Sequence, residues 1–311
     1  MKIVFMGTPD FAMESLKALD KANYDVLSVV TNPDRPKGRG MKLIASPVKQ
    51  YAEDRGMKIY QPKKVKGNTE FIEELKRQNP DVICVVAYGK ILPKEILDIP
   101  EKGCINVHGS LLPKYRGAAP IQWAVLNGDK ITGITTMFMD IGMDTGDMIL
   151  KKKVEIGEDE TTGELWERLA DLGGKTLVQT LELIEKGNAK RIKQSDDFSM
   201  APMLDKKMAK IDFKKQNSTQ IKNLVRGLNP IMGAYCYISG KKVKFWKVQK
   251  HTNIENMISG TVIESDPKKG LFIKTIDGMI EVLEIQGENA KKMPISDFLR
   301  GNHIEKGCVC E

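Results

Sequence analysis

The sequence predicts an α/β fold: a Rossmann-like, mostly parallel sheet in an N-terminal domain, followed by a smaller C-terminal β-barrel domain of the OB-like kind. Apolar strand-like runs alternate with amphipathic helical segments over residues 1–188, the pattern of a parallel sheet covered on both faces. Short, evenly spaced strand-like runs fill residues 207–311, as in small barrels. Residues 189–206 are polar and lack periodicity, so we expect a linker there.

The elements of the N-terminal domain follow from their spacing of apolar residues. Strands are expected at residues 2–6, 26–30, 58–60, 81–87, 103–107 and 131–140. Helices are expected at residues 11–19, 48–54, 68–78 and 161–185, the third capped by Asn68 or Thr69. Residues 147–156 alternate more strongly, which favours a strand added in antiparallel orientation.

The C-terminal domain is expected to begin with a helix at residues 219–227. Five strands are then expected, at residues 234–238, 242–248, 260–263, 271–276 and 279–285. The dipeptide Asp277-Gly278 between the last two is a strong hairpin signal.

The bulk composition narrows the classes of protein that remain. The chain has 311 residues and a net charge of +8, so a large and a small domain are expected, with a bias toward anionic partners. No apolar stretch approaches the roughly 20 residues that cross a bilayer, and the N-terminus enters a strand at once, without a secretory signal. Five cysteines, mostly in apolar runs, indicate reduced thiols in the cytoplasm. We expect a monomer.

Candidate catalytic residues stand at the end of the strand expected at residues 103–107. Asn106 and His108 are two apart, so on a strand their side chains point the same way. Asp144 follows in a glycine-rich loop and is placed to orient the imidazole. An amide donor, a base and a carboxylate suit transfer of an acyl or formyl group to an amine. Alone, however, Asn-x-His is also typical of an ordinary strand end, and Asp144 of an ordinary turn.

Several segments together resemble the signature of the folate-dependent formyltransferases. They are residues 106–113 (Asn-Val-His-Gly-Ser-Leu-Leu-Pro), 116–120 (Arg-Gly-Ala-Ala-Pro) and 144–147 (Asp-Thr-Gly-Asp). The resemblance implies 10-formyltetrahydrofolate as the donor and Asn106, His108 and Asp144 as catalytic residues. It also implies a folate pocket lined by Tyr88, Gly89, Ile91, Leu92, Ser110, Leu111, Leu112 and Pro113.

A basic loop bears on the formyl acceptor. Residues 34–49 contain one acidic residue, Asp34, and two prolines. The basic residues are Arg35, Lys37, Arg39, Lys42 and Lys49. Such a run is usually a solvated surface loop. Its sequence resembles, however, the inserted loop of the family members that act on methionyl-tRNA, which implies contact with the acceptor end of initiator tRNA.

A second basic region covers residues 206–250, with twelve basic residues against Asp212 alone. The positive charge of this region favours contact with phosphate groups. Lys206, Lys207 and Lys210 are the candidates nearest the linker. The interleaved aromatic residues favour a core role, because they alternate in strand-like runs.

Two further features of the sequence point to no additional ligand. Residues 7–10 (Gly-Thr-Pro-Asp) lack the Gly-x-Gly-x-x-Gly pattern of dinucleotide sites. Cys308, Cys310 and His303 make a poor metal site, so none is expected. Two other functions stay open: formylation of an amino sugar or another small amine, and RNA binding by a chain whose catalytic domain is inactive.

Overall fold

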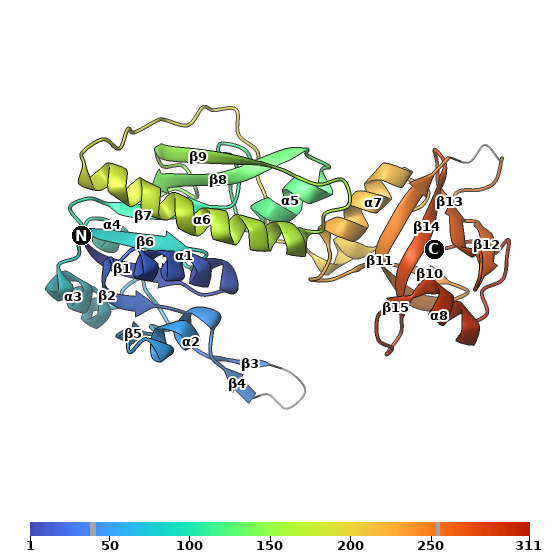
Figure 1. Ribbon diagram of the computed structural model, residues 1–311, viewed down its shortest axis with the longest axis horizontal. Helices are drawn as coiled ribbons and strands as arrows, with labels where there is room; N and C mark the ends of the chain where they lie inside the picture. Colours follow the sequence, from blue (N-terminus) through green and yellow to red (C-terminus); the bar gives the residue numbers. More distant parts are fainter. Residues whose placement is uncertain (38–41, 253–255) are drawn as a thin grey trace. The chain divides into compact units, whose positions relative to one another are not determined.

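The computed structural model describes residues 1–37, 42–252 and 256–311, which fall into two compact units (Figure 1). The first unit comprises residues 1–120, 131–155 and 166–202, and the second comprises residues 121–130, 156–165 and 203–311. The predicted domain limits at residues 188 and 206 stay a prediction.

A seven-stranded sheet forms the centre of the first unit. Its strands are β1 (Lys2–Gly7), β2 (Asp25–Val30), β5 (Ile59–Tyr60), β6 (Val82–Val86), β7 (Cys104–His108), β8 (Ile131–Phe138) and β9 (Met148–Glu155). The strand order is β5-β2-β1-β6-β7-β8-β9. The first five strands in this order pair in parallel, and β8 and β9 are added antiparallel. The predicted mostly parallel sheet is therefore confirmed.

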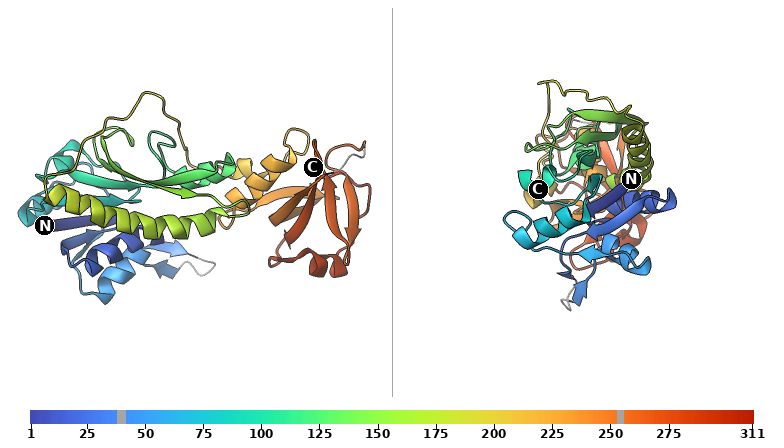
Figure 2. Two further views of the ribbon diagram at one scale, coloured as in Figure 1. Left: turned by 45° about the horizontal axis from the view of Figure 1, so that its top comes forward. Right: turned by 90° about the vertical axis from the view of Figure 1, so that its left-hand side faces the viewer.

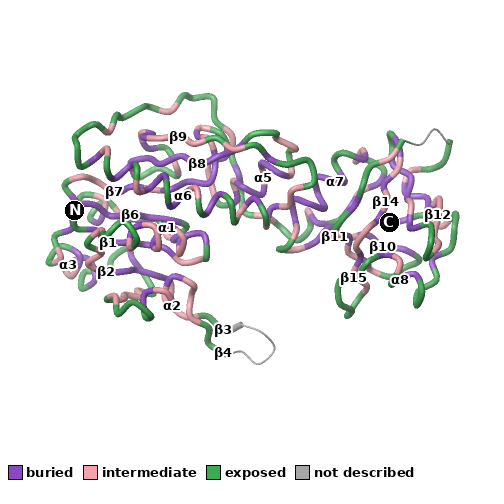
Figure 3. Tube along the Cα trace, in the orientation of Figure 1, coloured by how far each residue is buried: buried purple, intermediate pink, exposed green. Residues whose placement is uncertain are grey.

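Helices cover both faces of this sheet. They are α1 (Asp10–Lys21), α2 (Pro47–Asp54), α3 (Thr69–Gln78), α4 (Lys94–Leu97) and α6 (Thr162–Glu185), whereas α5 (Pro120–Leu126) belongs to the second unit from Ile121 onward. Helix α6 lies along one face (Figure 2), where the hydroxyls of Thr180 and Thr136 on β8 are 2.7 Å apart. Helix α3 packs Phe71 and Leu75 against Val4 in a separate cluster. Because both faces are covered, β1 and β6 are buried along almost their whole length (Figure 3).

The predicted cap of α3 is confirmed, because the Asn68 side chain accepts a hydrogen bond from the Phe71 amide at 3.2 Å. Helices α4 and α5, of four and seven residues, were not expected from the sequence. They are too short for a helical period to be read. The basic loop contains a small hairpin, β3 (Arg35–Lys37) and β4 (Lys42–Ile44), which was also not expected.

The second unit holds an antiparallel sheet. Its elements are η1 (Lys206–Ala209), α7 (Ser218–Gly227), β10 (Ala234–Ile238), β11 (Lys241–His251), β12 (Val262–Asp266), β13 (Gly270–Lys274), β14 (Met279–Gly287), β15 (Met293–Pro294) and α8 (Ile295–Gly301). The strand order is β10-β11-β14-β13-β12, and β15 pairs with β14. Helix α7 begins with a capping box made by Asn217 and Gln220. The predicted C-terminal β domain is confirmed.

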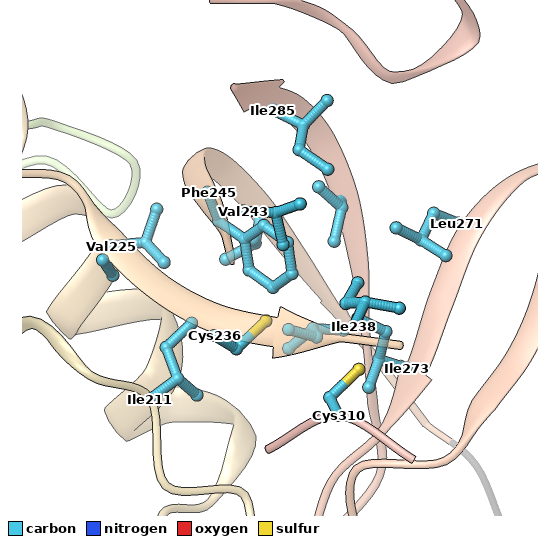
Figure 4. Close-up of a cluster of buried hydrophobic side chains, with 14 of the residues drawn as sticks. Ile211, Val225, Cys236, Ile238, Val243, Phe245, Leu271, Ile273, Ile285 and Cys310 are labelled. Carbon is cyan, nitrogen blue, oxygen red and sulfur yellow. The ribbon is translucent and has the colours of Figure 1, made fainter. Parts of the chain in front are cut away.

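Residues 307–311 connect the two edge strands of this sheet. Tyr237 on β10 exchanges two backbone hydrogen bonds with Glu311, at 2.8 and 2.9 Å. On the other side, the Val262 amide of β12 donates to the Cys308 carbonyl at 2.8 Å. The tail thereby closes the sheet into a barrel around a core that contains Cys236 and Cys310 (Figure 4).

Candidate active site

Strand β7 positions Asn106 and His108 through backbone pairing on both sides. Asn106 pairs with Val85 on the parallel neighbour β6 and with Met137 on the antiparallel neighbour β8. His108 pairs with Thr135 on β8. The His108 side chain is buried and that of Asn106 is half-buried. The carboxyl end of β7 is thus a rigid platform, the usual position of ligand sites in such sheets.

The hydrogen bonding of His108 determines its tautomer. Its Nε2 atom lies 2.9 Å from the backbone carbonyl oxygen of Tyr115. A carbonyl only accepts, so Nε2 must carry a proton. The Nδ1 atom faces Asp144 Oδ2 across 3.7 Å, which is beyond hydrogen-bond distance. The ring is therefore held at one nitrogen and turned toward the carboxylate with the other.

Asp144 reaches the same point from the loop between β8 and β9. Its Oδ1 atom accepts a long hydrogen bond from Asn106 Nδ2 at 3.5 Å, and its Oδ2 atom accepts from the Gly117 amide at 2.8 Å. The backbone of Asp144 is left-handed, with φ at 54°, a conformation that L-residues adopt at a cost. At Gly146, a Cβ atom would lie 1.7 Å from the Phe138 carbonyl, so the loop requires glycine there.

The structure thus brings together the three predicted catalytic residues, from two different elements. They form an amide, an imidazole and a carboxylate around one point at the end of β7.

The segment after β7 contains four of the predicted folate-binding residues. Ser110 and Leu112 are fully buried, and Leu111 and Pro113 are half-buried. The Thr135 hydroxyl donates to the Ser110 carbonyl at 2.7 Å and accepts from the Leu112 amide at 3.1 Å. This segment is therefore tied to β8 rather than free to rearrange.

The loop after β6 contains the other four, and it emerges at the same edge because β6 and β7 are parallel neighbours. Tyr88 and Leu92 pack into the core of the first unit, and burial raises the pKa of Tyr88 to about 12. Gly89 has a positive φ of 76°. Ile91 is 77% exposed, so this large apolar side chain of the loop is open to a ligand.

The predicted tRNA-binding residues lie apart from the catalytic group in the chain. Arg35 is exposed on β3, the backbones of Lys37 and Lys42 pair across the hairpin, and Arg39 lies outside the described residues. In the second unit, Lys206, Lys207 and Lys210 are exposed at η1.

The base of the hairpin is fixed by Asp34. Its carboxylate accepts from Lys49 Nζ at 2.7 Å and from Gln61 Nε2 at 2.8 Å. The hydrogen bonds from Lys49 and Gln61 hold the pKa of Asp34 below its usual value. Lys49, one of the five basic residues of this loop, is therefore engaged in supporting it.

Sequence reasoning missed the contribution of residues 190–202. Gln194 donates to the carbonyls of Asp144 and Gly146 at 2.7 and 2.9 Å, and accepts from Arg116. Ser199 accepts from the Tyr115 amide through its hydroxyl at 2.9 Å. The signal in the sequence is the polar composition of this segment, which predicted a linker. Composition does not identify the residues that Gln194 and Ser199 contact.

Among the described residues, three or more His, Cys, Asp or Glu side chains do not gather in any metal-binding arrangement. Within the same residues, no helix is long and apolar enough to cross a membrane.

Comparison with known proteins places this site in a family. A model described as formyl transferase matches residues 1–181, and one described as formyl transferase, C-terminal domain, matches residues 203–303. The chain belongs to the formyl transferase family. Curated relatives include the methionyl-tRNA formyltransferases of Caldanaerobacter subterraneus subsp. tengcongensis and Clostridioides difficile, each 50% identical over 99% of both chains. The predicted enzyme class is therefore confirmed.

Solved structures share the fold at lower identity. An N-formyltransferase from Helicobacter canadensis, solved with folinic acid and dTDP-3-aminofucose, has a TM-score of 0.67 and 20% identity; the match covers 94% of this chain and 100% of that one. HypX from Aquifex aeolicus, solved with tetrahydrofolic acid, has a TM-score of 0.63 and 16% identity, with 96% and 47% of the two chains covered. At this level of identity, these structures support the fold alone.

Proposed function

We propose that this enzyme transfers the formyl group of 10-formyltetrahydrofolate to the amino group of methionine on initiator methionyl-tRNA, for translation initiation. The observation that carries the proposal is the convergence of Asn106, His108 and Asp144 within 3.5 and 3.7 Å at the end of β7. The full-length relatives named methionyl-tRNA formyltransferases support the choice of acceptor. We place the reaction in the cytoplasm and take the enzyme to act as a monomer without a metal.

The chemistry assigned to the site is an addition followed by an elimination. The methionine amine attacks the formyl carbon, so a carbon–nitrogen bond forms and the formyl oxygen becomes an oxyanion. Asn106 donates to this oxyanion from its amide without changing its own charge. The tetrahedral intermediate then collapses, the bond to the donor nitrogen breaks, and that nitrogen leaves with the proton that the amine has lost.

His108 and Asp144 divide the remaining work. Since Nε2 of His108 is bound to the Tyr115 carbonyl, only Nδ1 is left to face the reacting atoms. When the ring carries a second proton, Nδ1–H donates to the oxyanion beside Asn106. The Asp144 carboxylate, 3.7 Å away, compensates that charge and accepts the proton lost by the amine, directly or through water.

The donor is assigned to the loops that follow β6 and β7. These loops emerge at one edge of the sheet, at the position where open parallel sheets bind ligands. The exposed Ile91 offers an apolar contact for a flat ring. The assignment of Tyr88, Gly89, Ile91, Leu92 and residues 110–113 to the pterin and its linkage is part of the proposal.

The acceptor is assigned to the basic hairpin and to the lysines of η1. Arg35 and Lys206, Lys207 and Lys210 are exposed cations that suit phosphate contacts. We include Lys37, Arg39 and Lys42 in this proposed contact because they lie in the same basic loop as Arg35.

The decisive experiment supplies the enzyme with 10-formyltetrahydrofolate and either initiator or elongator methionyl-tRNA. Transfer to the initiator species only is the expected result. Transfer to neither, with an amino-sugar nucleotide accepted instead, would contradict the acceptor and keep the formyl chemistry. Tetrahydrofolate binding without transfer to any amine would contradict the catalytic assignment.

A further inference from the structure

The segment after α6 passes next to the candidate active site. There the Gln194 side chain contacts the loop that carries Asp144. Gln194 is half-buried in a stretch whose other members, residues 190–193 and 195–198, are exposed. Its Nε2 atom donates to the Asp144 and Gly146 carbonyls at 2.7 and 2.9 Å. Its Oε1 atom accepts from Nε and Nη2 of Arg116 at 3.0 and 2.8 Å. All four contacts lie within the first unit.

These contacts require an amide at this position. The loop presents two carbonyls, which only accept, and Arg116 presents two N–H groups, which only donate. The four contacts therefore fix which end of the Gln194 amide is nitrogen. A carboxylate of the same length would satisfy Arg116 and leave the two carbonyls without their donor.

The loop needs an external support because its conformation is unfavourable. Asp144 has a left-handed backbone at φ 54°, and such a residue persists only where its surroundings hold it. Gln194 holds the carbonyl of this residue and that of Gly146, two positions later. Gly117 holds the carboxylate itself at 2.8 Å.

We propose that Gln194 is a positioning residue for formyl transfer, which acts by holding the Asp144 loop in its catalytic conformation. The inference rests on the proposed role of Asp144. Arg116 supports Gln194 in turn, and its guanidinium lies over the Phe198 ring at 4.5 Å. Residues 190–198 are then part of the active site rather than a passive connection.

The first test is Gln194→Met, which keeps the length of the side chain and removes all four contacts. We expect kcat to fall by about 10- to 100-fold, because small displacements of catalytic groups cost that much. The KM values for donor and tRNA should change little. Gln179→Met, at an exposed glutamine of α6, is the matched control and should leave kcat unchanged. A kcat within twofold of the parent in Gln194→Met would overturn the proposal.

A double-mutant cycle with Asp144→Ala separates the positioning role of Gln194 from the proposed function on which it rests. The rates are measured in single turnovers at stoichiometric enzyme. If Gln194 acts through Asp144, adding Gln194→Met to Asp144→Ala should cost less than about twofold. Full additivity would overturn the positioning role and leave the role of Asp144 intact. An Asp144→Ala variant as active as the parent would instead contradict the proposed function.

Gln194→Glu distinguishes support of the loop from support of Arg116. The carboxylate of this variant still accepts hydrogen bonds from Arg116 but donates none to the Asp144 and Gly146 carbonyls. We therefore expect activity as low as in Gln194→Met. Restored activity would assign the effect to Arg116 and overturn the proposal. The thermal midpoint of each variant is measured alongside, and the kcat comparison uses a temperature at which all are folded.

Discussion

Asn106 and His108 stand on a strand, whereas Asp144 stands on a loop, and the two supports differ in kind. Strand β7 is held by continuous backbone pairing to β6 and β8. The Asp144 loop is held instead by the Gly117 amide and the Gln194 side chain, which are 27 and 50 residues away along the chain. A strand end is rigid because of its neighbours in the sheet. A catalytic loop is only as rigid as the few side chains and amides that reach it.

The strongest test of the strand side of this comparison is Asn106→Ala. Removing one donor to an oxyanion should lower kcat on the order of 100- to 1,000-fold, with the fold unchanged because β7 keeps its backbone pairs. Single-turnover formyl transfer measures the loss. Asn188→Ala, at an exposed asparagine after α6, is the control and should behave as the parent. A loss of only a few-fold for Asn106→Ala would remove this residue from the proposed oxyanion site.

On the loop side, Gly117→Ala should lower kcat by about 10- to 100-fold. Gly117 has a φ of 122°, and a Cβ atom there would lie 2.8 Å from the Ala201 carbonyl. The backbone must shift, and the amide that holds Asp144 shifts with it.

Gly187→Ala is the matched control for this change. Gly187 also has a positive φ, 67°, but nothing lies within 4 Å of the added Cβ. It should lower the thermal midpoint through backbone strain and leave kcat unchanged. Equal loss of kcat in both variants would indicate a general effect of strain rather than loss of the Asp144 contact.

The β3–β4 hairpin is a second segment that is held by side chains from elsewhere in the chain, Lys49 and Gln61. Asp34→Ala removes the carboxylate that binds Lys49 and Gln61. We expect the KM for initiator methionyl-tRNA to rise about two- to fivefold, since a half-buried ion pair close to the protein surface contributes little free energy. The donor KM should not change. Steady-state kinetics with each substrate varied in turn would detect the difference, and a selective rise in the donor KM would contradict the assignment of this hairpin to tRNA.

The smallest effect is expected at Glu74, where a charged group supports the fold and not the site. Hydrogen bonds from Tyr60 and Lys58 lower the pKa of Glu74 to about 2. A carboxylate with a lowered pKa stabilises the folded state above its unfolded pKa, near 4.5, and this contribution is lost as the pH falls from there toward 2.

Glu74→Gln should therefore flatten the dependence of the thermal midpoint on pH between about 4.5 and 2. It should leave kcat at neutral pH unchanged. A parallel pH dependence in the variant and the parent would show that Glu74 is not the group responsible.

The contrast between strand β7 and the Asp144 loop also explains how much of the fold and the site the sequence predicted. The sheet strands follow from apolar runs, and Asn106 and His108 follow from their place at the end of one of these runs. Asp144 follows from its glycine-rich motif. The contacts of Gln194 and Ser199 reach across 50 and 84 residues, and no local period encodes a partner at that distance. The short helices α4 and α5 escaped prediction because four to seven residues hold too few turns.

The closure of the C-terminal barrel by residues 307–311 has a consequence for biosynthesis. Tyr237 finds its backbone partner at Glu311, after every other strand of the barrel has been made. During translation, β10 and β12 therefore emerge with open edges, and exposed strand edges invite pairing with other chains. This unit is complete only once residues 307–311 are available, and pairing across so long a sequence separation slows its folding.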